Sequence, residues 1–224
     1  MNLSAFSPEI PKAARSREWH VSGLRADDRA VARELYTWAN LVTAIRVVAG
    51  FALFAICWQT GLLRFGLFGL LVYWIGDLLD GWLARTLRQE TLLGAQLDIL
   101  ADRILVVVFY AVYAADQPAK ALAALVFLFE FAILDTYLSN QFMRWPILSP
   151  NYFYVIDRET WLWLWSKPAK AFNCGLVTLL LIGLPWQWPA LAVTLVLTVI
   201  RLRFAHRMLL LTARLPAPPP VPEN

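Results

Sequence analysis

The chain has 224 residues, of which 59% are hydrophobic and 16% are charged, and its mean hydropathy is +0.55. Soluble domains carry about 25% charged residues, so this composition excludes an ordinary soluble domain and predicts a protein of the lipid bilayer. The formal charge of +4 does not indicate a nucleic-acid partner, because basic residues on the cytosolic side of a membrane protein account for it.

The amino-terminal part of the chain is polar. Residues 1–21 are expected to be flexible, and no cleavable signal peptide is predicted, because the first 39 residues contain no apolar stretch. Residues 22–38 are predicted to form an amphipathic helix that lies in the membrane interface. One face of this helix would be apolar and another basic, carrying respectively Leu24, Val31, Leu35 and Trp38, and Arg25, Arg29 and Arg33.

Apolar runs fill most of the remaining chain. A membrane-spanning helix needs about 20 mostly apolar residues, and six runs meet this length approximately, one of them interrupted by charges. We therefore expect an all-α polytopic membrane protein with six transmembrane helices in one membrane domain, residues 22–208, followed by a Pro-rich tail, residues 209–224. The predicted spans are about 40–60, 66–86, 94–115, 118–140, 169–184 and 187–208.

Basic residues concentrate on one side of this layout. The loops at about 61–65, 115–118 and 184–188 contain only Arg64 and the acidic Asp116 among charged residues, whereas the opposite side is rich in arginine and lysine. Basic short loops stay in the cytosol. We therefore expect an integral protein of a bacterial cytoplasmic membrane, with both termini and the functional site facing the cytosol.

The connection at 141–168 is rich in aromatic residues. Trp and Tyr are enriched at membrane interfaces, so the segment is expected to lie at headgroup level. A second interpretation is that part of it covers the functional site and helps to select a substrate. The aromatic residues are Trp145, Tyr152, Phe153, Tyr154, Trp161, Trp163 and Trp165.

Four carboxylates interrupt the second and third apolar runs. Asp77 and Asp80 are three residues apart, and Asp98 and Asp102 are four apart, so each pair shares one face of a helix. A carboxylate near the centre of a membrane helix costs about 3 kcal/mol. Such a cost indicates a functional site in which the two faces meet.

A divalent cation is the simplest way to hold these four acids together. Carboxylates that converge in a medium of low dielectric repel unless they bind cations or protons. Oxygen ligands suit Mg²⁺, or Mn²⁺ in its place, and the absence of Cys and His from the motif argues against zinc. Gly81 and Gly94 leave room for a bulky ligand, and the Arg85 guanidinium matches phosphate geometry.

The motif resembles the signature of the CDP-alcohol phosphotransferase family. Asp77 to Arg85 reads DxxDGxxAR, eight residues follow, and Gly94 to Asp102 reads GxxxDxxxD. The segment NLVTAIR also resembles the Asn-x-x-Thr-x-x-Arg pattern of the family's first membrane helix. The residues at the fixed positions are Asp77, Asp80, Gly81, Ala84, Arg85, Gly94, Asp98 and Asp102, with Asn40, Thr43 and Arg46 in the first helix.

The resemblance implies an enzyme of phospholipid biosynthesis. It would move a phosphatidyl group from CDP-diacylglycerol onto a small alcohol and release CMP, as a homodimer with two divalent ions. By resemblance, Asp77, Asp80 and Asp98, with Asp102, form the metal site, and Asp102 is also the general base. The residues implied in binding the CDP donor are Asn40, Thr43, Gly81, Ala84, Arg85 and Gly94.

The acceptor alcohol is less well specified. The segment SKPAKAFN resembles the start of the fifth helix in phosphatidylglycerophosphate and phosphatidylinositol phosphate synthases. Lys167 and Lys170, joined by Arg144 or Arg201, are therefore candidate contacts for an acceptor phosphate, or else anchors at the membrane surface. Glycerol 3-phosphate is favoured, and inositol phosphate, inositol or serine are alternatives.

Other interpretations stay open. Carboxylates inside a membrane also occur in cation transporters, and a catalytically inactive scaffold could keep the same fold. Asn40 and Thr43 could form only the start and cap of a helix. Glu130 and Asp135 lie outside the motif, and we expect them either to pair with an arginine such as Arg46 or Arg201 or to line a polar cavity.

Overall fold

The structure is a computed structural model that describes residues 34–145 and 147–213. The described residues form helices and contain no strand, which confirms the all-α class. The predicted flexible segment, 1–21, and most of the predicted interfacial helix, 22–38, lie outside the described residues. At the other end, the last helix continues to Thr212, so the first four residues of the predicted tail, 209–212, are helical.

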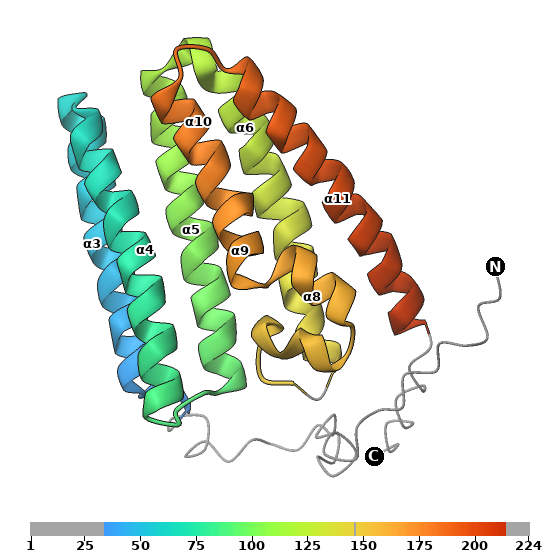
Figure 1. The fold of residues 1–224 in the computed structure, drawn as a ribbon. Coiled ribbons are helices and arrows are strands. Elements are labelled where there is room, and N and C mark those ends of the chain that lie inside the picture. The colour runs from blue at the N-terminus through green and yellow to red at the C-terminus, as the bar shows by residue number, and fades with distance from the viewer. Residues whose placement is uncertain (1–33, 146, 214–224) are drawn as a thin grey trace, which may run out of the picture.

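Three long helices open the described part of the chain. Thr37 caps the first of them by accepting a hydrogen bond from the backbone N–H of Asn40, and Thr91 caps the third in the same way through Gly94. Gly61, with φ of 65°, ends the first helix in a left-handed conformation. In Figure 1 the first two helices run side by side and the third lies next to them. They are α3 (Trp38–Thr60), α4 (Leu63–Thr86) and α5 (Leu92–Asp116).

The second half of the chain contains two further helical segments, each of which includes a π-helical turn. One segment runs from Pro118 to Arg144, and the other from Lys167 to Gly183, before the long final helix. The helical elements are η2 (Pro118–Lys120), α6 (Ala121–Phe129), η3 (Glu130–Asp135), α7 (Thr136–Asn140), η4 (Gln141–Arg144), α9 (Lys167–Lys170), η6 (Ala171–Leu176), α10 (Val177–Gly183) and α11 (Trp188–Thr212). Figure 1 shows α6 and α10 next to α5, and α11 beyond them, where it contacts both α6 and α10.

The outside of the bundle is apolar. Val48, Leu78, Leu179 and Val199 each expose between 64% and 70% of their surface, which a soluble protein of this size would not tolerate in such numbers. Inside, aromatic rings of α3, α5 and α6 contact one another, with Tyr110 and Phe127 at 4.8 Å between centroids. The protein is thus built to bury its outer surface in lipid.

Four helical segments are long and apolar enough to cross a membrane, judged by length and composition. They are Trp38–Thr60, Leu63–Thr86, Pro118–Arg144 and Trp188–Thr212. The other two predicted spans correspond to α5, which carries Asp98, Asp102 and Arg103, and to the segment 167–183, which is short and contains the turn η6. The membrane class is confirmed, and the count of six spans stays a prediction.

The Trp-rich connection folds into a packed unit, which we call the cap and define as residues 147–166. Its buried Phe153, Leu164 and Trp165 pack against Phe204 and Met208 of α11. Arg207 of α11 clamps it with two hydrogen bonds to Asp157, at 2.7 and 2.9 Å, and an ion pair with Glu159. The cap contains η5 (Pro150–Val155) and α8 (Arg158–Leu164), and lies at the end of the bundle where α4 joins α5 (Figure 1).

Candidate active site

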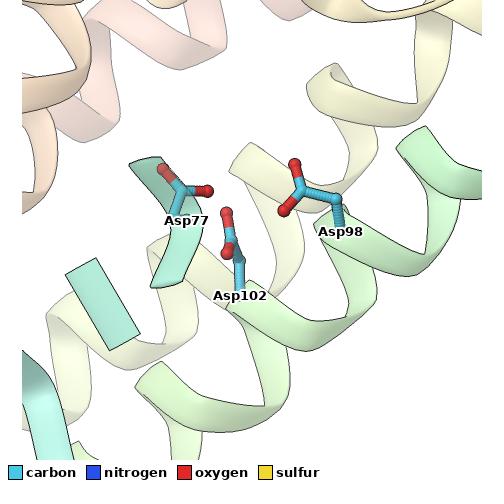
Figure 2. Close-up of side chains that lie close together, drawn as sticks. All are labelled: Asp77, Asp98 and Asp102. Atoms are coloured by element: carbon cyan, nitrogen blue, oxygen red, sulfur yellow. The ribbon is translucent and has the colours of Figure 1, made fainter. Parts of the chain in front are cut away.

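Three of the four aspartates of the motif converge between α4 and α5. One carboxylate oxygen from each of Asp77, Asp98 and Asp102 lies within 4.8 Å of the other two. Figure 2 shows Asp77 approaching from one helix, and Asp98 and Asp102 approaching from successive turns of the other. The sequence spacing produces this arrangement, because residues four apart on a helix project from one face.

Asp80 lies on the inner side of this group. It is only 4% exposed, and its Oδ2 accepts a hydrogen bond of 2.7 Å from the hydroxyl of Thr43 on α3. The hydroxyl oxygen of Thr43 also lies 3.1 Å from the carbonyl oxygen of Ala39, so its one proton is shared between the two acceptors. Thr43 therefore holds one motif carboxylate against α3, and it is not the N-cap of that helix.

Arg46 contacts all four aspartates from inside the bundle. Its side chain is 2% exposed, with Nη2 2.5 Å from Asp98, Nη1 2.9 Å from Asp102 and 3.7 Å from Asp77, and Nε 3.1 Å from Asp80. Its aliphatic part crosses α4 at Gly76, where an added Cβ would stand 2.6 Å from Cδ of Arg46. One guanidinium thus provides a fixed positive charge beneath the cluster.

The carboxylate oxygens of the cluster suit a hard divalent cation. Asp77, Asp98 and Asp102 expose 37%, 40% and 21% of their side chains, whereas the Arg46 side chain that contacts them is 2% exposed. Carboxylate oxygens are the ligands that Mg²⁺ and Mn²⁺ prefer, and such ions usually keep sites for substrate phosphates. A single arginine compensates only one of four acidic side chains, which favours an additional cation.

A cleft opens beside the carboxylates, between the start of α3, the end of α4 and the start of α5. It encloses about 530 Å³, counting the part that is open to solvent, and reaches the acidic cluster at Asp80 and Asp98. The six residues predicted to bind a CDP donor all line it. They are Asn40, Thr43, Gly81, Ala84, Arg85 and Gly94.

Close approach of two helices shapes the floor of this cleft. The Asn40 amide donates to the carbonyls of Glu34 and Leu35, both at 2.9 Å. A Cβ at Gly94 would stand 3.1 Å from Oδ1 of Asn40 and 2.9 Å from Oγ1 of Thr91. Gly94 is therefore required for α5 to begin against α3, and Thr37, not Asn40, caps the first helix.

Arg85 and Gly81 form the opposite wall. The guanidinium of exposed Arg85 lies over Gly81, with Nη1 3.2 Å from the position of an added Cβ. A planar group with several donors, held above a residue without a side chain, is suited to binding a phosphate that enters the gap.

Comparison with protein families decides the class of this site. A family model described as CDP-alcohol phosphatidyltransferase matches residues 36–200, which include every residue of the cluster and the cleft named above. The chain belongs to this family. It is a membrane enzyme of phospholipid headgroup transfer, and its substrate is a CDP-alcohol. No curated protein and no solved structure matched the chain.

In this CDP-alcohol phosphatidyltransferase the cap supplies a further wall of the cleft. Leu148, Ser149 and Asn151 line it together with the motif residues. The phenol of Tyr152 donates a hydrogen bond of 2.7 Å to Glu90 in the α4–α5 connection. Burial and this hydrogen bond raise the pKa of Tyr152 to about 12, so the phenol keeps its proton at neutral pH.

The predicted acceptor contacts separate into two groups. Lys170 donates to Oδ1 of Asn151 at 3.0 Å and is near enough to Asp98 for a Coulombic interaction. Lys167 and Arg144 are exposed, and neither lines the cleft. Arg201 is instead 2% exposed on α11 and is not brought to the cleft.

Arg201 takes part in a buried ionic network. It pairs with Glu130 and, at 3.1 Å, with Asp135, both in the π-helical turn η3. Asp135 also pairs with Arg103, the neighbour of Asp102, and Arg103 donates to Ser139 at 3.0 Å. The expected pairing of Glu130 and Asp135 with an intramembrane arginine is confirmed for Arg201, whereas Arg46, the other arginine suggested for it, pairs with the motif aspartates.

Sequence reasoning missed three features of the site. The central position of Arg46 could have been inferred from its three-residue spacing after Thr43, which places both on one face. The need for glycine at position 76 could not, because it depends on where the Arg46 side chain crosses α4. Ser149 and Asn151 carry no recognisable pattern, since the fold of the cap alone brings them to the cleft.

Proposed function

We propose that the enzyme transfers a phosphatidyl group from CDP-diacylglycerol to a small phosphorylated alcohol, with glycerol 3-phosphate as the favoured acceptor, and releases CMP. The observation that carries this proposal is that a convergent carboxylate triad adjoins a cleft lined by all six candidate donor-binding residues. Such an arrangement combines a place for a nucleotide with a place for charge stabilisation and proton removal.

Asp102 is proposed as the general base. The acceptor hydroxyl oxygen forms a bond to the β-phosphorus of the donor, while the bond from this phosphorus to the oxygen bridging the two phosphates breaks. CMP leaves with that electron pair, and the hydroxyl proton passes to the Asp102 carboxylate. The Arg46 contact of 2.9 Å orients Asp102, and its partial exposure leaves it accessible to a substrate.

The metal would be held by Asp77, Asp98 and Asp102, with Asp80 completing the set. One or two Mg²⁺ or Mn²⁺ ions bound there would neutralise the pyrophosphate and the charge that develops on CMP. Asp80 is proposed to act mainly through its bond with Thr43, which holds the end of α4 in register with α3.

Donor binding is assigned to the cleft. Arg85 would contact a phosphate of the donor, and Gly81 and Ala84 would let the nucleotide approach the α4 backbone closely. Asn40, Thr43 and Gly94 would form the floor, where Gly94 of α5 lies close to Asn40 of α3 and Thr43 of α3 bonds to Asp80 of α4.

A phosphorylated acceptor is favoured by the cations near the cleft. Lys170 interacts electrostatically with Asp98. Lys167 lies in the same short helix as Lys170, and exposed Arg144 is a further candidate contact. Inositol phosphate is the second candidate, and inositol or serine would need no such cations. Arg201 is left out of the proposed acceptor site, because it is buried and paired with two carboxylates.

We further propose six membrane spans, a cytosol-facing site in a bacterial cytoplasmic membrane and a homodimer. The basic residues at the end of the bundle that holds the site support this orientation. The span α5 would be tolerated in lipid because Asp98, Asp102 and Arg103 are paired inside the bundle. The span 167–183 carries its only charges, Lys167 and Lys170, in its first four residues, where they can reach the membrane surface.

The decisive experiment is an assay of CMP release by the purified enzyme with CDP-diacylglycerol. Glycerol 3-phosphate, inositol phosphate, inositol, serine and no acceptor are compared, each with Mg²⁺ and with a chelator. We expect release that depends on both the metal and one phosphorylated acceptor. Release with serine alone would overturn the acceptor assignment, and equal release in chelator would overturn the metal mechanism.

A further inference from the structure

The cap is tied to two distant parts of the bundle. On one side, the bidentate contact of Arg207 with Asp157 ties the cap to α11. On the other side, Tyr152 bonds to Glu90 between α4 and α5. Buried Pro150 and Phe153 lie between these two ties. The residues of the cap that line the cleft therefore belong to a packed unit that is fixed at both sides.

Two polar residues of the cap, Ser149 and Asn151, line the cleft. The hydroxyl of Ser149 is buried, and among the described residues it has no hydrogen-bond partner. A buried hydroxyl without a partner costs about 1–3 kcal/mol, so a group that can pair with it would be favoured there. Asn151 accepts from Lys170 through Oδ1, a contact that does not use the two donors of its amide nitrogen.

The position of these residues points to the donor and not to the reacting centre. The cleft that they line includes Asn40, Gly81 and Arg85, and it touches the acidic cluster only at Asp80 and Asp98. Asp77 and the proposed base Asp102 do not line it. A ligand part in contact with the cap therefore lies beside the reaction site, where the nucleotide of a CDP-alcohol would extend.

We infer that Ser149 and Asn151 bind the nucleotide part of the donor and that Tyr152, through Glu90, is a positioning residue that holds them in place. The base and ribose of a nucleotide present hydroxyl, carbonyl and ring-nitrogen groups, which a hydroxyl and an amide can bind. The inference rests on the proposed function. It adds a second wall, supplied by residues far along the chain from the motif.

The test measures binding of CDP to the full-length protein in detergent by isothermal titration calorimetry in the presence of Mg²⁺. Ser149→Ala and Asn151→Ala are each expected to weaken binding by about 3- to 10-fold, the effect of losing one hydrogen bond. Tyr152→Phe removes only the hydroxyl that bonds to Glu90, and should weaken CDP binding by roughly 2- to 5-fold.

Tyr154→Phe is the matched control, because Tyr154 is an exposed tyrosine of the same cap that does not line the cleft. It should bind CDP like the unaltered protein. Thermal unfolding of each variant checks that the cap stays folded. In steady-state assays, the three test variants should raise KM for the CDP-alcohol and leave KM for the acceptor unchanged, a pattern that general loosening of the structure would not produce.

The outcomes separate the two proposals. If the unaltered protein binds CDP and all three test variants bind it equally well, the nucleotide assignment of the cap is wrong and the proposed function stands. If the variants raise only KM for the acceptor, the cap selects the alcohol and the inference is likewise wrong. If the unaltered protein binds no CDP, the proposed function fails, and the inference fails with it.

Discussion

Arg46 on α3 and Asp102 on α5 are joined by a hydrogen bond of 2.9 Å at the base of the acidic cluster. The same guanidinium reaches Asp77, Asp80 and Asp98. The three helices that carry the motif are therefore connected through one buried cation, and the carboxylates keep their arrangement through contacts within the protein.

Replacing Arg46 by glutamine should make the fold depend on metal. The change leaves four acidic side chains without their buried counter-charge, and removal of one partner from a buried ionic group costs about 3–5 kcal/mol. We expect a lower unfolding temperature in chelator for Arg46→Gln, and a larger rise on adding Mn²⁺ than in the unaltered protein. An equal response to Mn²⁺ in both proteins would show that Arg46 does not compensate the cluster.

Replacing Asp98 by asparagine should abolish turnover while preserving the fold. Asp98 is 40% exposed, and its removal relieves repulsion among the acids, so the unfolding temperature in chelator should stay the same or rise. Activity should fall by roughly 100-fold or more, as on losing one electrostatic contact to a transition state. Asp116→Asn, at the exposed far end of the same helix, is the control and should keep full activity. Near-normal turnover by Asp98→Asn would rule out Asp98 as a metal ligand.

Two glycines of α4 should respond differently to alanine. At Gly76 the new methyl group would meet Cβ and Cδ of Arg46 at 2.7 and 2.6 Å, and such overpacking costs about 1–3 kcal/mol. At Gly81 it would meet only the mobile end of Arg85, at 3.2 Å. We expect Gly76→Ala to lower the unfolding temperature, and Gly81→Ala to keep stability but weaken CDP binding. The reverse order of stability would contradict the packing of Arg46 on α4.

The buried network on α11 should matter for stability. Glu130→Gln leaves Arg201, which is 2% exposed, with Asp135 as its remaining carboxylate partner, and we expect a loss of about 3 kcal/mol or more in the free energy of unfolding. Arg203→Gln serves as the control. Arg203 is 74% exposed and pairs with Glu159 at the surface, so its replacement should change stability by less than about 1 kcal/mol. Denaturation of both variants in detergent compares the two pairs directly.

The sequence allowed most of the helices to be placed, because long apolar runs can adopt few other structures in a membrane. The predicted starts at 40 and 94 lie within two residues of Trp38 and Leu92, the observed first residues of α3 and α5. The π-helical turns η3 and η6 were not predicted, since an extra residue in a helical turn leaves no mark in an apolar pattern. A segment of 141–168 that covers the site was one of two interpretations of the sequence, but the packing of the cap was not predicted, because it depends on contacts with α11.

The candidate site was predictable where spacing along a helix determines it. Asp98 and Asp102 share a face by their separation alone, and the structure brings Asp77 to them. The surroundings of Arg201 and Ser149 depend on how distant segments pack. Sequence reasoning therefore offered Arg201 both as an acceptor contact and as a partner of Glu130 or Asp135, and only the structure shows that it is paired with these acids. The sequence did not single out Ser149.

The arginine beneath the carboxylates also means that folding of the protein does not require a bound metal ion. Since Arg46 already holds Asp98 and Asp102 together, newly made chains can insert and fold before any ion arrives. On the proposed mechanism, a cell that runs short of divalent cations would keep a stock of intact, silent enzyme in its membrane. Phospholipid synthesis could then resume as soon as the ion returned, with no need for new protein.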